Sequence, residues 1–106
     1  MTEHIFSTTK WAEMDMFNQM GNIGSEVGRA LSAKRQGNLN RCQAAFYRGL
    51  DLIDETTSLW AAQKKAGLKE LLYARELFAE SIITDKVDLT IENYFMQFAI
   101  AARLHK

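Results

Sequence analysis

The chain has 106 residues, of which 47% are hydrophobic and 25% charged, and its 13 basic and 13 acidic side chains give no net charge. The length suits one globular domain over residues 1–106, and the composition excludes wholesale disorder. The neutral sum argues against a dedicated nucleic-acid binder, which usually carries a basic surplus. No apolar run reaches the roughly 18 residues of a membrane span, and the first ten residues do not look like a signal peptide, so we expect a cytoplasmic protein without a membrane segment.

The sequence contains no proline and only six glycines, so it lacks the turn signals that an all-β domain requires. Between the glycines, apolar residues recur at intervals of three and four, which is the period of a helix. We therefore predict an all-α fold, an up-down antiparallel four-helix bundle with a long first helix. Residues 1–8 precede the helical pattern and are predicted to be poorly ordered.

The first predicted helix runs from about residue 10 to residue 36. Lys34 and Arg35 in its last turn suit the negative end of the helix dipole, and Gly37 supplies the left-handed residue with which many helices end. Asn38 is a good N-cap for the next helix, so Gly37-Asn38 predicts a tight turn between two helices. The apolar face of this first helix consists of Trp11, Met14, Met16, Phe17, Met20, Ile23, Val27 and Leu31.

The second predicted helix begins near Leu39 and has two candidate ends. Residues 56–58 are weak helix formers, which favours a break there. Trp60 nevertheless continues the apolar stripe, and Gly67 is a typical helix end. We favour a break or an irregular stretch between Glu55 and Gly67. The stripe itself consists of Leu39, Cys42, Phe46, Leu50 and Ile53.

Two further helices are predicted over residues 68–83 and 89–104, with a short polar connection at 84–88. Short connections favour antiparallel neighbours, which is the basis for predicting a bundle. The inward face of the third helix is predicted to consist of Leu68, Leu71, Leu72, Ala79, Ile82 and Ile83. The fourth helix carries, at helical spacing, Ile91, Tyr94, Phe95, Phe98 and Ala102.

The segment Asn22-Ile23-Gly24-Ser25-Glu26-Val27 resembles a motif shared by a family of small, uncharacterised prokaryotic all-helical proteins. Gly37-Asn38 and residues 68–72 are similar to later parts of that family, so the resemblance spans about residues 21–98. It implies a helical fold and no particular activity.

Residues 37–54 separately resemble the second half of a tetratricopeptide repeat. Gly37, Phe46, Leu50 and Leu52 stand where that repeat has its turn glycine and its packing residues. No second copy follows at the spacing of about 34 residues that such repeats show. The resemblance therefore implies a repeat-like pair of helices rather than a repeat array.

A line of small residues distinguishes the first helix. Offsets of three, four and seven place them on one face, and they are Gly21, Gly24, Ser25, Gly28 and Ser32. Each interior glycine costs about 0.8–1 kcal/mol relative to alanine, so the three glycines need a compensating contact. Tight packing of a neighbouring helix, or a kink, is the simpler interpretation. The alternative is a groove for a small ligand or a nucleotide.

Arg75 lies among apolar positions of the third predicted helix. A partly buried guanidinium without an acidic partner would cost several kcal/mol. We predict a buried ion pair between Glu26 and Arg75 that fixes the register of two helices, with Glu92 as the second choice of partner. An anion-binding Arg75 beside the glycine face is the functional alternative.

The sequence shows no combination of side chains typical of catalysis or metal binding. Histidine occurs only at His4 and His105, without the neighbouring histidines or carboxylates that a helical metal site requires. Cys42 has no histidine to act as its base, and we predict that it is a small buried hydrophobe. We therefore expect no catalytic residue, no metal and no cofactor.

Basic residues gather between Val27 and Leu50, a stretch that contains no acidic residue. The five are Arg29, Lys34, Arg35, Arg41 and Arg48. Solvated helix ends are the simpler explanation, and contact with RNA or with an acidic protein is the alternative. Acidic residues return at Asp51, Asp54 and Glu55, where they would oppose an extended anionic ligand.

Helix lengths suggest how the protein assembles. At 1.5 Å per residue, the first helix would span about 40 Å and the third and fourth about 24 Å each. Unless the chain bends at the glycines, the unmatched part would expose a patch formed by Trp11, Met14, Phe17 and Met20. Soluble monomers rarely leave such a patch bare. We therefore expect a homodimer formed partly through this patch.

The function that these observations favour is that of a non-catalytic interaction or scaffold protein, which associates with itself and can present a helical groove to a protein partner. The alternative is a small-ligand or nucleotide-binding protein that uses the Gly21–Gly28 face.

Overall fold

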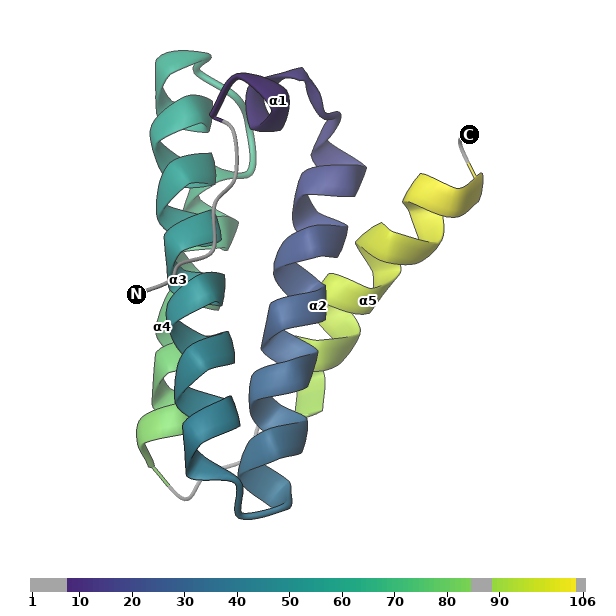
Figure 1. The fold of residues 1–106 in the computed structure, drawn as a ribbon. Helices are drawn as coiled ribbons and strands as arrows, with labels where there is room; N and C mark the ends of the chain where they lie inside the picture. The colour runs from purple at the N-terminus through teal and green to yellow at the C-terminus, as the bar shows by residue number, and fades with distance from the viewer. Residues whose placement is uncertain (1–7, 85–88, 105–106) are drawn as a thin grey trace.

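The computed structural model describes residues 8–84 and 89–104, and within those ranges all the regular structure is helical (Figure 1). The helices are α1 (Thr8–Glu13), α2 (Met16–Arg35), α3 (Leu39–Ala62), α4 (Leu68–Ile83) and α5 (Leu89–Leu104). The predicted all-α class is confirmed, and the bounds predicted for the last two helices are those of α4 and α5. Poor order is predicted for residues 1–8, of which residues 1–7 lie outside the described residues and Thr8 begins α1.

The predicted long first helix is divided into α1 and α2, and the division occurs at Asp15. The carboxylate of Asp15 accepts a 2.8 Å hydrogen bond from the backbone N–H of Asn18, so Asp15 caps the N-terminus of α2. An N-cap residue has an extended backbone, and Asp15 has φ −74° and ψ 168°. The prediction of one continuous helix over residues 10–36 is therefore wrong, and the break lies before the glycines.

The predicted turn at Gly37-Asn38 is confirmed. Gly37 has a φ of +75°, and its N–H donates to the carbonyl of Lys34 at 3.0 Å. The N–H of Asn38 donates to the carbonyl of Ala33 at 2.9 Å, which completes the double hydrogen bond of a Schellman helix end. The Asn38 side chain then accepts a 3.1 Å bond from the N–H of Arg41 and caps α3.

The end of α3 has the same pattern with a lysine in place of the glycine. The N–H groups of Lys64 and Lys65 donate to the carbonyls of Ala61 and Trp60, at 3.2 and 2.9 Å. Lys64 has a φ of +52°, in the left-handed region that side chains disfavour. The helix thus continues through residues 56–58 and breaks at 63–67, inside the range that the sequence favoured.

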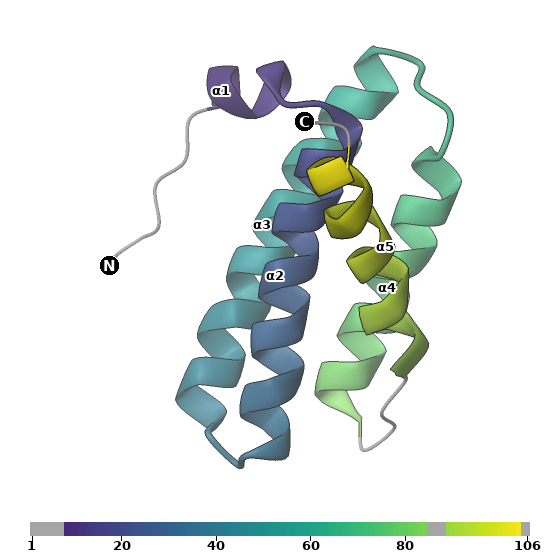
Figure 2. The same ribbon diagram turned by 90° about the vertical axis from the view of Figure 1, so that its right-hand side faces the viewer.

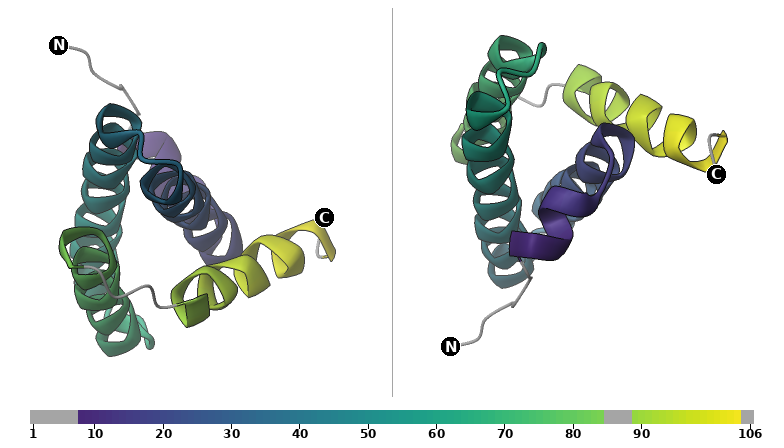
Figure 3. Two further views of the ribbon diagram at one scale, coloured as in Figure 1. Left: turned by 90° about the horizontal axis from the view of Figure 1, so that it is seen from below. Right: turned by 90° about the horizontal axis from the view of Figure 1, so that it is seen from above.

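The helix α2 is central (Figures 1 and 2). Its contacts with α3 and with α5 are the two most extensive contacts between helices. Figure 3 shows that α4 returns along α3, whereas α5 crosses α2 obliquely and its C-terminal half leads away from the other helices. Contact between α4 and α5 is slight. Burial of Tyr94 on α5 and the negative charge of Glu70 on α4 raise the pKa of Tyr94. A four-helix up-down bundle is therefore not confirmed.

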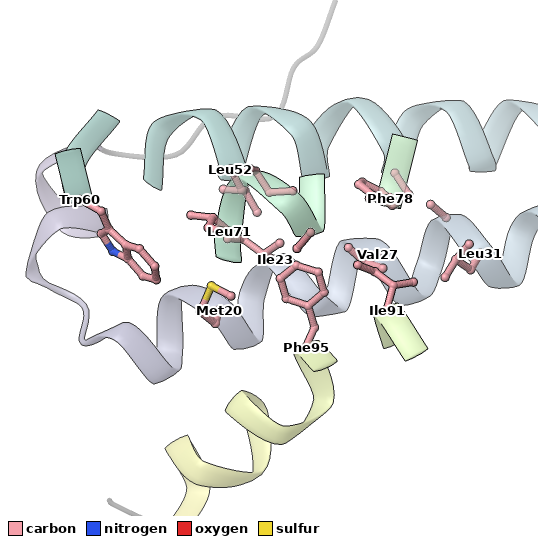
Figure 4. Packing of buried hydrophobic residues seen from close by; sticks show 14 of the residues in the cluster. Met20, Ile23, Val27, Leu31, Leu52, Trp60, Leu71, Phe78, Ile91 and Phe95 are labelled. Atoms are coloured by element: carbon pink, nitrogen blue, oxygen red, sulfur yellow. The ribbon is translucent and has the colours of Figure 1, made fainter. Parts of the chain in front are cut away.

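The core lies where α2 meets the other helices (Figure 4). Its labelled side chains are Met20, Ile23, Val27 and Leu31 of α2, Leu52 and Trp60 of α3, Leu71 and Phe78 of α4, and Ile91 and Phe95 of α5. The inward face predicted for α4 is partly wrong, because Leu72 and Ile83 are exposed and Ala74, Phe78 and Ser81 are buried.

Gly49 of α3 explains the orientation of α4. A Cβ atom at Gly49 would lie 2.8 Å from Cε2 of Phe78, so only glycine leaves room for this ring. The ring also packs edge-on against Phe46, with 5.1 Å between the ring centroids. Phe78 therefore turns its own side of α4 toward α3, and Leu72 and Ile83 turn outward.

Candidate functional site

The small-residue face of α2 is where α5 crosses. A Cβ atom at Gly24 would lie 2.6 Å from Cβ of Phe95, closer than two non-bonded carbon atoms approach. The space that remains has a volume of about 110 Å³ and is lined by Gly21, Gly24, Ser25, Gly28, Glu92, Phe95 and Met96. Small-molecule sites usually have about 300–1,000 Å³. The Gly21–Gly28 face is thus shaped for a neighbouring helix at Gly24 and leaves too little space for a nucleotide.

A larger groove lies between the second half of α2 and the first half of α3, with a volume of about 570 Å³. It is lined by Gly28, Arg29, Ser32, Ala33 and Gln36 from α2 and by Arg41, Ala44, Ala45 and Arg48 from α3. We refer to these nine residues as the arginine groove. Of the predicted small-residue face, Gly28 and Ser32 belong to it.

The structure divides the five basic residues of the 27–50 stretch into two groups. Lys34 Nζ donates to the carbonyl of Ser81 at 2.5 Å and to that of Thr84, which satisfies carbonyls at the end of α4. Arg35 pairs with Glu92 at 3.3 Å and links α2 to α5. The remaining three, which line the groove, are Arg29, Arg41 and Arg48.

Glu26 pairs with two of these arginines. Its Oε2 lies 3.2 Å from Nη1 of Arg29, and its Oε1 lies 3.2 Å from Nε of Arg48. The Glu26 side chain is only 14% exposed, whereas Arg29 is mostly exposed. Arg41 is exposed and forms no ion pair within the described ranges. The groove therefore holds three guanidinium groups, of which those of Arg29 and Arg48 share the carboxylate of Glu26.

Arg75 pairs with Asp54 of α3 and not with Glu26. Its Nε donates to Oδ1 of Asp54 at 2.8 Å and its Nη2 to Oδ2 at 3.3 Å. The hydrogen bond to Asp54 raises the pKa of Arg75. Both side chains are solvent-exposed, because Ala74 and Phe78 occupy the buried positions of α4. The prediction of a buried Glu26–Arg75 pair is wrong.

The predicted dimer patch is partly buried within the chain itself. Trp11 and Met20 are only 4% and 1% exposed, whereas Met14 is exposed and Phe17 is half-buried. The reason is the break at Asp15, which turns α1 over the ends of α2 and α3 (Figure 3). The prediction that all four side chains are exposed is therefore wrong for Trp11 and Met20.

A buried polar network joins α1, α2 and α3 at this end of the molecule. Trp11 Nε1 donates to Oγ1 of Thr56 at 2.8 Å, and that hydroxyl donates to the carbonyl of Leu52 at 2.7 Å. Gln19 Nε2 donates to the carbonyl of Trp11 at 2.8 Å, and Gln19 Oε1 accepts a 3.0 Å bond from Nε1 of Trp60. Sequence reasoning missed this network. The available signal was Gln19 and Thr56, two polar residues at apolar positions of their helices.

The helix α4 lies at an edge of the molecule (Figure 3), and it carries large apolar side chains that are exposed to solvent. Leu72, Tyr73 and Ile83 retain 42%, 62% and 74% of their accessible surface. Exposed charged residues share this side at helical spacing. We define the α4 face as Lys69, Leu72, Tyr73, Glu76, Glu80 and Ile83.

In the part of the chain that the structure describes, no three His, Cys, Asp or Glu side chains lie together as a metal site would require. No helix in the same ranges combines the length and apolar character needed to cross a bilayer. Cys42 is buried, as predicted, and His4 and His105 lie outside the described residues.

No family model, curated protein or solved structure matches this chain.

Proposed function

We propose that the protein is a non-catalytic interaction module that forms a homodimer, and that two copies associate through the α4 face. The observation that carries this proposal is the exposure of Leu72, Tyr73 and Ile83 on one side of one helix. A group of exposed apolar side chains bordered by polar ones is typical of a protein-binding surface.

The charges on the α4 face fit a second copy of the same chain. Lys69 lies near the start of α4, and Glu76 and Glu80 lie toward its end. If two α4 helices pack antiparallel about a twofold axis, the start of one helix lies beside the end of the other. Lys69 of each copy then faces Glu80 of the other, and Leu72 and Tyr73 meet near the axis. Such a contact is self-complementary and closes as a dimer.

Sedimentation equilibrium of the full chain over a range of concentrations tests the proposal. We expect a species of twice the 12.1 kDa chain mass. Tyr73→Glu places a carboxylate near the twofold axis, where it meets Glu76 of the other copy, and should leave a monomer. The matched control is Tyr47→Glu, since Tyr47 is an exposed tyrosine of α3 that lies outside the α4 face. A wild-type monomer at high micromolar concentration would contradict the proposal.

Exchange of two charges tests the antiparallel geometry. Lys69→Glu alone and Glu80→Lys alone should each weaken the dimer, because like charges then face each other. The double variant restores opposite charges and should recover most of the affinity. Two exposed pairs contribute about 0.2–1 kcal/mol each, so the effect of either single change should be a several-fold weakening. A double variant weaker than both single variants would exclude this arrangement.

A further inference from the structure

We infer that the arginine groove binds a compact multivalent oxyanion, which is a small molecule with two or more phosphate or carboxylate groups. The groove lies on α2 and α3, so this inference goes beyond the proposed dimer, which uses α4.

The first argument is the supply of unused donors. Each guanidinium has five N–H donors in a fixed fork that matches the oxygens of phosphate and carboxylate. Glu26 accepts from Nε of Arg48 and lies 3.2 Å from one terminal nitrogen of Arg29. Both arginines keep further donors, and Arg41 on the facing helix forms no ion pair with any described residue. A bound oxyanion would add charge-assisted hydrogen bonds from the donors that Glu26 does not use.

The second argument is the size and the lining of the groove. Its volume of about 570 Å³ lies in the range of about 300–1,000 Å³ that is usual for small-molecule sites. Gly28, Ala33, Ala44 and Ala45 contribute little or no side chain to it, so space remains between the helices. The Ser32 hydroxyl accepts a 3.5 Å bond from Nε2 of Gln36, which leaves the hydroxyl proton free to donate to a ligand.

The third argument concerns the length of the ligand. The positive charge of the groove ends with Arg48, because the next turns of α3 carry Asp51 and Glu55, and also Asp54, which pairs with Arg75 of α4. Lys34 and Arg35 do not extend it, since they bind the end of α4 and Glu92. A nucleic acid or a long acidic peptide would have to pass these carboxylates. A small anion satisfies the three arginines without doing so.

Nuclear magnetic resonance titration of the full chain in about 0.15 M salt tests the inference, with inorganic pyrophosphate and citrate as separate probes. We expect saturable amide shifts confined to residues 28–48 for at least one probe. Pyrophosphate binding with weak citrate binding indicates a phosphate ligand, and the reverse a carboxylate ligand.

Arginine variants with a matched control separate a specific site from general charge. Arg41→Gln and Arg48→Gln should each weaken binding about tenfold, as the loss of one charge-assisted hydrogen bond predicts. Arg75→Gln removes the same charge from an exposed arginine of α4 outside the groove, so it should change affinity less than about twofold, as screened long-range charge predicts. Glu26→Gln should strengthen binding, because it removes the competing carboxylate.

Three results would overturn the inference. One is the absence of saturable binding by both probes. Another is equal weakening by Arg41→Gln and Arg75→Gln. The third is tighter binding of a single-stranded oligonucleotide or a polyglutamate peptide to the same residues. The amide spectrum reports the fold of each variant in the same measurement, and none of these results bears on the dimer.

Discussion

The helices α3 and α5 both pack against α2, but different interactions hold them. The contact with α3 includes a buried hydrogen-bond network, in which Gln19 joins Trp60 of α3 to α1. The contact with α5 depends on a close fit between Gly24 and Phe95, supplemented by one exposed ion pair. A buried network is damaged when one partner is removed, whereas a close fit is damaged when an atom is added. The two contacts should therefore respond to opposite kinds of substitution.

The largest effect is expected on the α3 side, from Gln19→Leu. This change leaves the indole N–H of Trp60 without a partner in the core, whereas the carbonyl of Trp11 loses one of two bonds and keeps the 3.2 Å bond from the N–H of Met14. An unsatisfied buried polar group costs about 1–3 kcal/mol, so with the second lost bond we expect a loss of about 2–3 kcal/mol in the free energy of unfolding. Urea denaturation measures it. Gln43→Leu, on the exposed side of α3, is the control and should change the value by less than about 0.5 kcal/mol.

On the α5 side, Gly24→Ala should destabilise the protein by about 1–2 kcal/mol. The added methyl group forces α5 away from α2, and this cost exceeds the gain of about 1 kcal/mol in helix propensity. Gly28→Ala is the matched comparison, since its Cβ atom would meet only Oε2 of Glu92 at 3.9 Å. It should stabilise the protein by about 1 kcal/mol. Two alanine variants that shift thermal unfolding in the same direction would contradict the difference between the two positions.

The far end of α3 offers a smaller test, through Lys64→Gly. Glycine adopts the left-handed conformation of Lys64 without steric cost, although it also gives the unfolded chain more freedom. We expect a net gain of about 0.5–1 kcal/mol in the free energy of unfolding. Gly37→Ala, at the equivalent position of α2, should instead cost about 1 kcal/mol. If both variants lose stability, the left-handed conformation is not what distinguishes these two helix ends.

The smallest effect is expected from Arg75→Met, which touches neither contact with α2. The Arg75–Asp54 pair is exposed to solvent, so its loss should change stability by less than about 1 kcal/mol. The change should shrink further in high salt. A loss of more than about 2 kcal/mol in the same urea measurement would instead indicate a buried ion pair, such as the predicted pair of Arg75 with Glu26.

Local signals explain which parts of the fold could be predicted. Gly37 and Asn38 define a helix end and a helix start through their own backbone and side chain, so the turn was predictable. Asp15 is an equally good cap, but it lies between Met14 and Met16, and the apolar period continues across it. The apolar period alone therefore predicts one continuous helix where the structure has α1 and α2.

The candidate site depended on long-range geometry and was predictable only in part. The sequence identifies all five basic residues of the 27–50 stretch, but it does not show that Lys34 and Arg35 are bound by other helices. Glu26 and Arg29 stand three residues apart, which is a local signal for an ion pair on one helix face. The second partner, Arg48, follows only from the antiparallel packing of α2 and α3.

The contact between Gly24 and Phe95 has a consequence for the order of folding. These residues stand far apart in the chain, whereas α2 and α3 are joined by residues 36–38 and close a short loop. Long loops cost more entropy to close, so α5 docks after the α2–α3 hairpin has formed. During synthesis on the ribosome, that hairpin can assemble before α5 has emerged. The glycine side of α2 then remains in water until α5 has emerged, and before that point the growing chain is most exposed to aggregation.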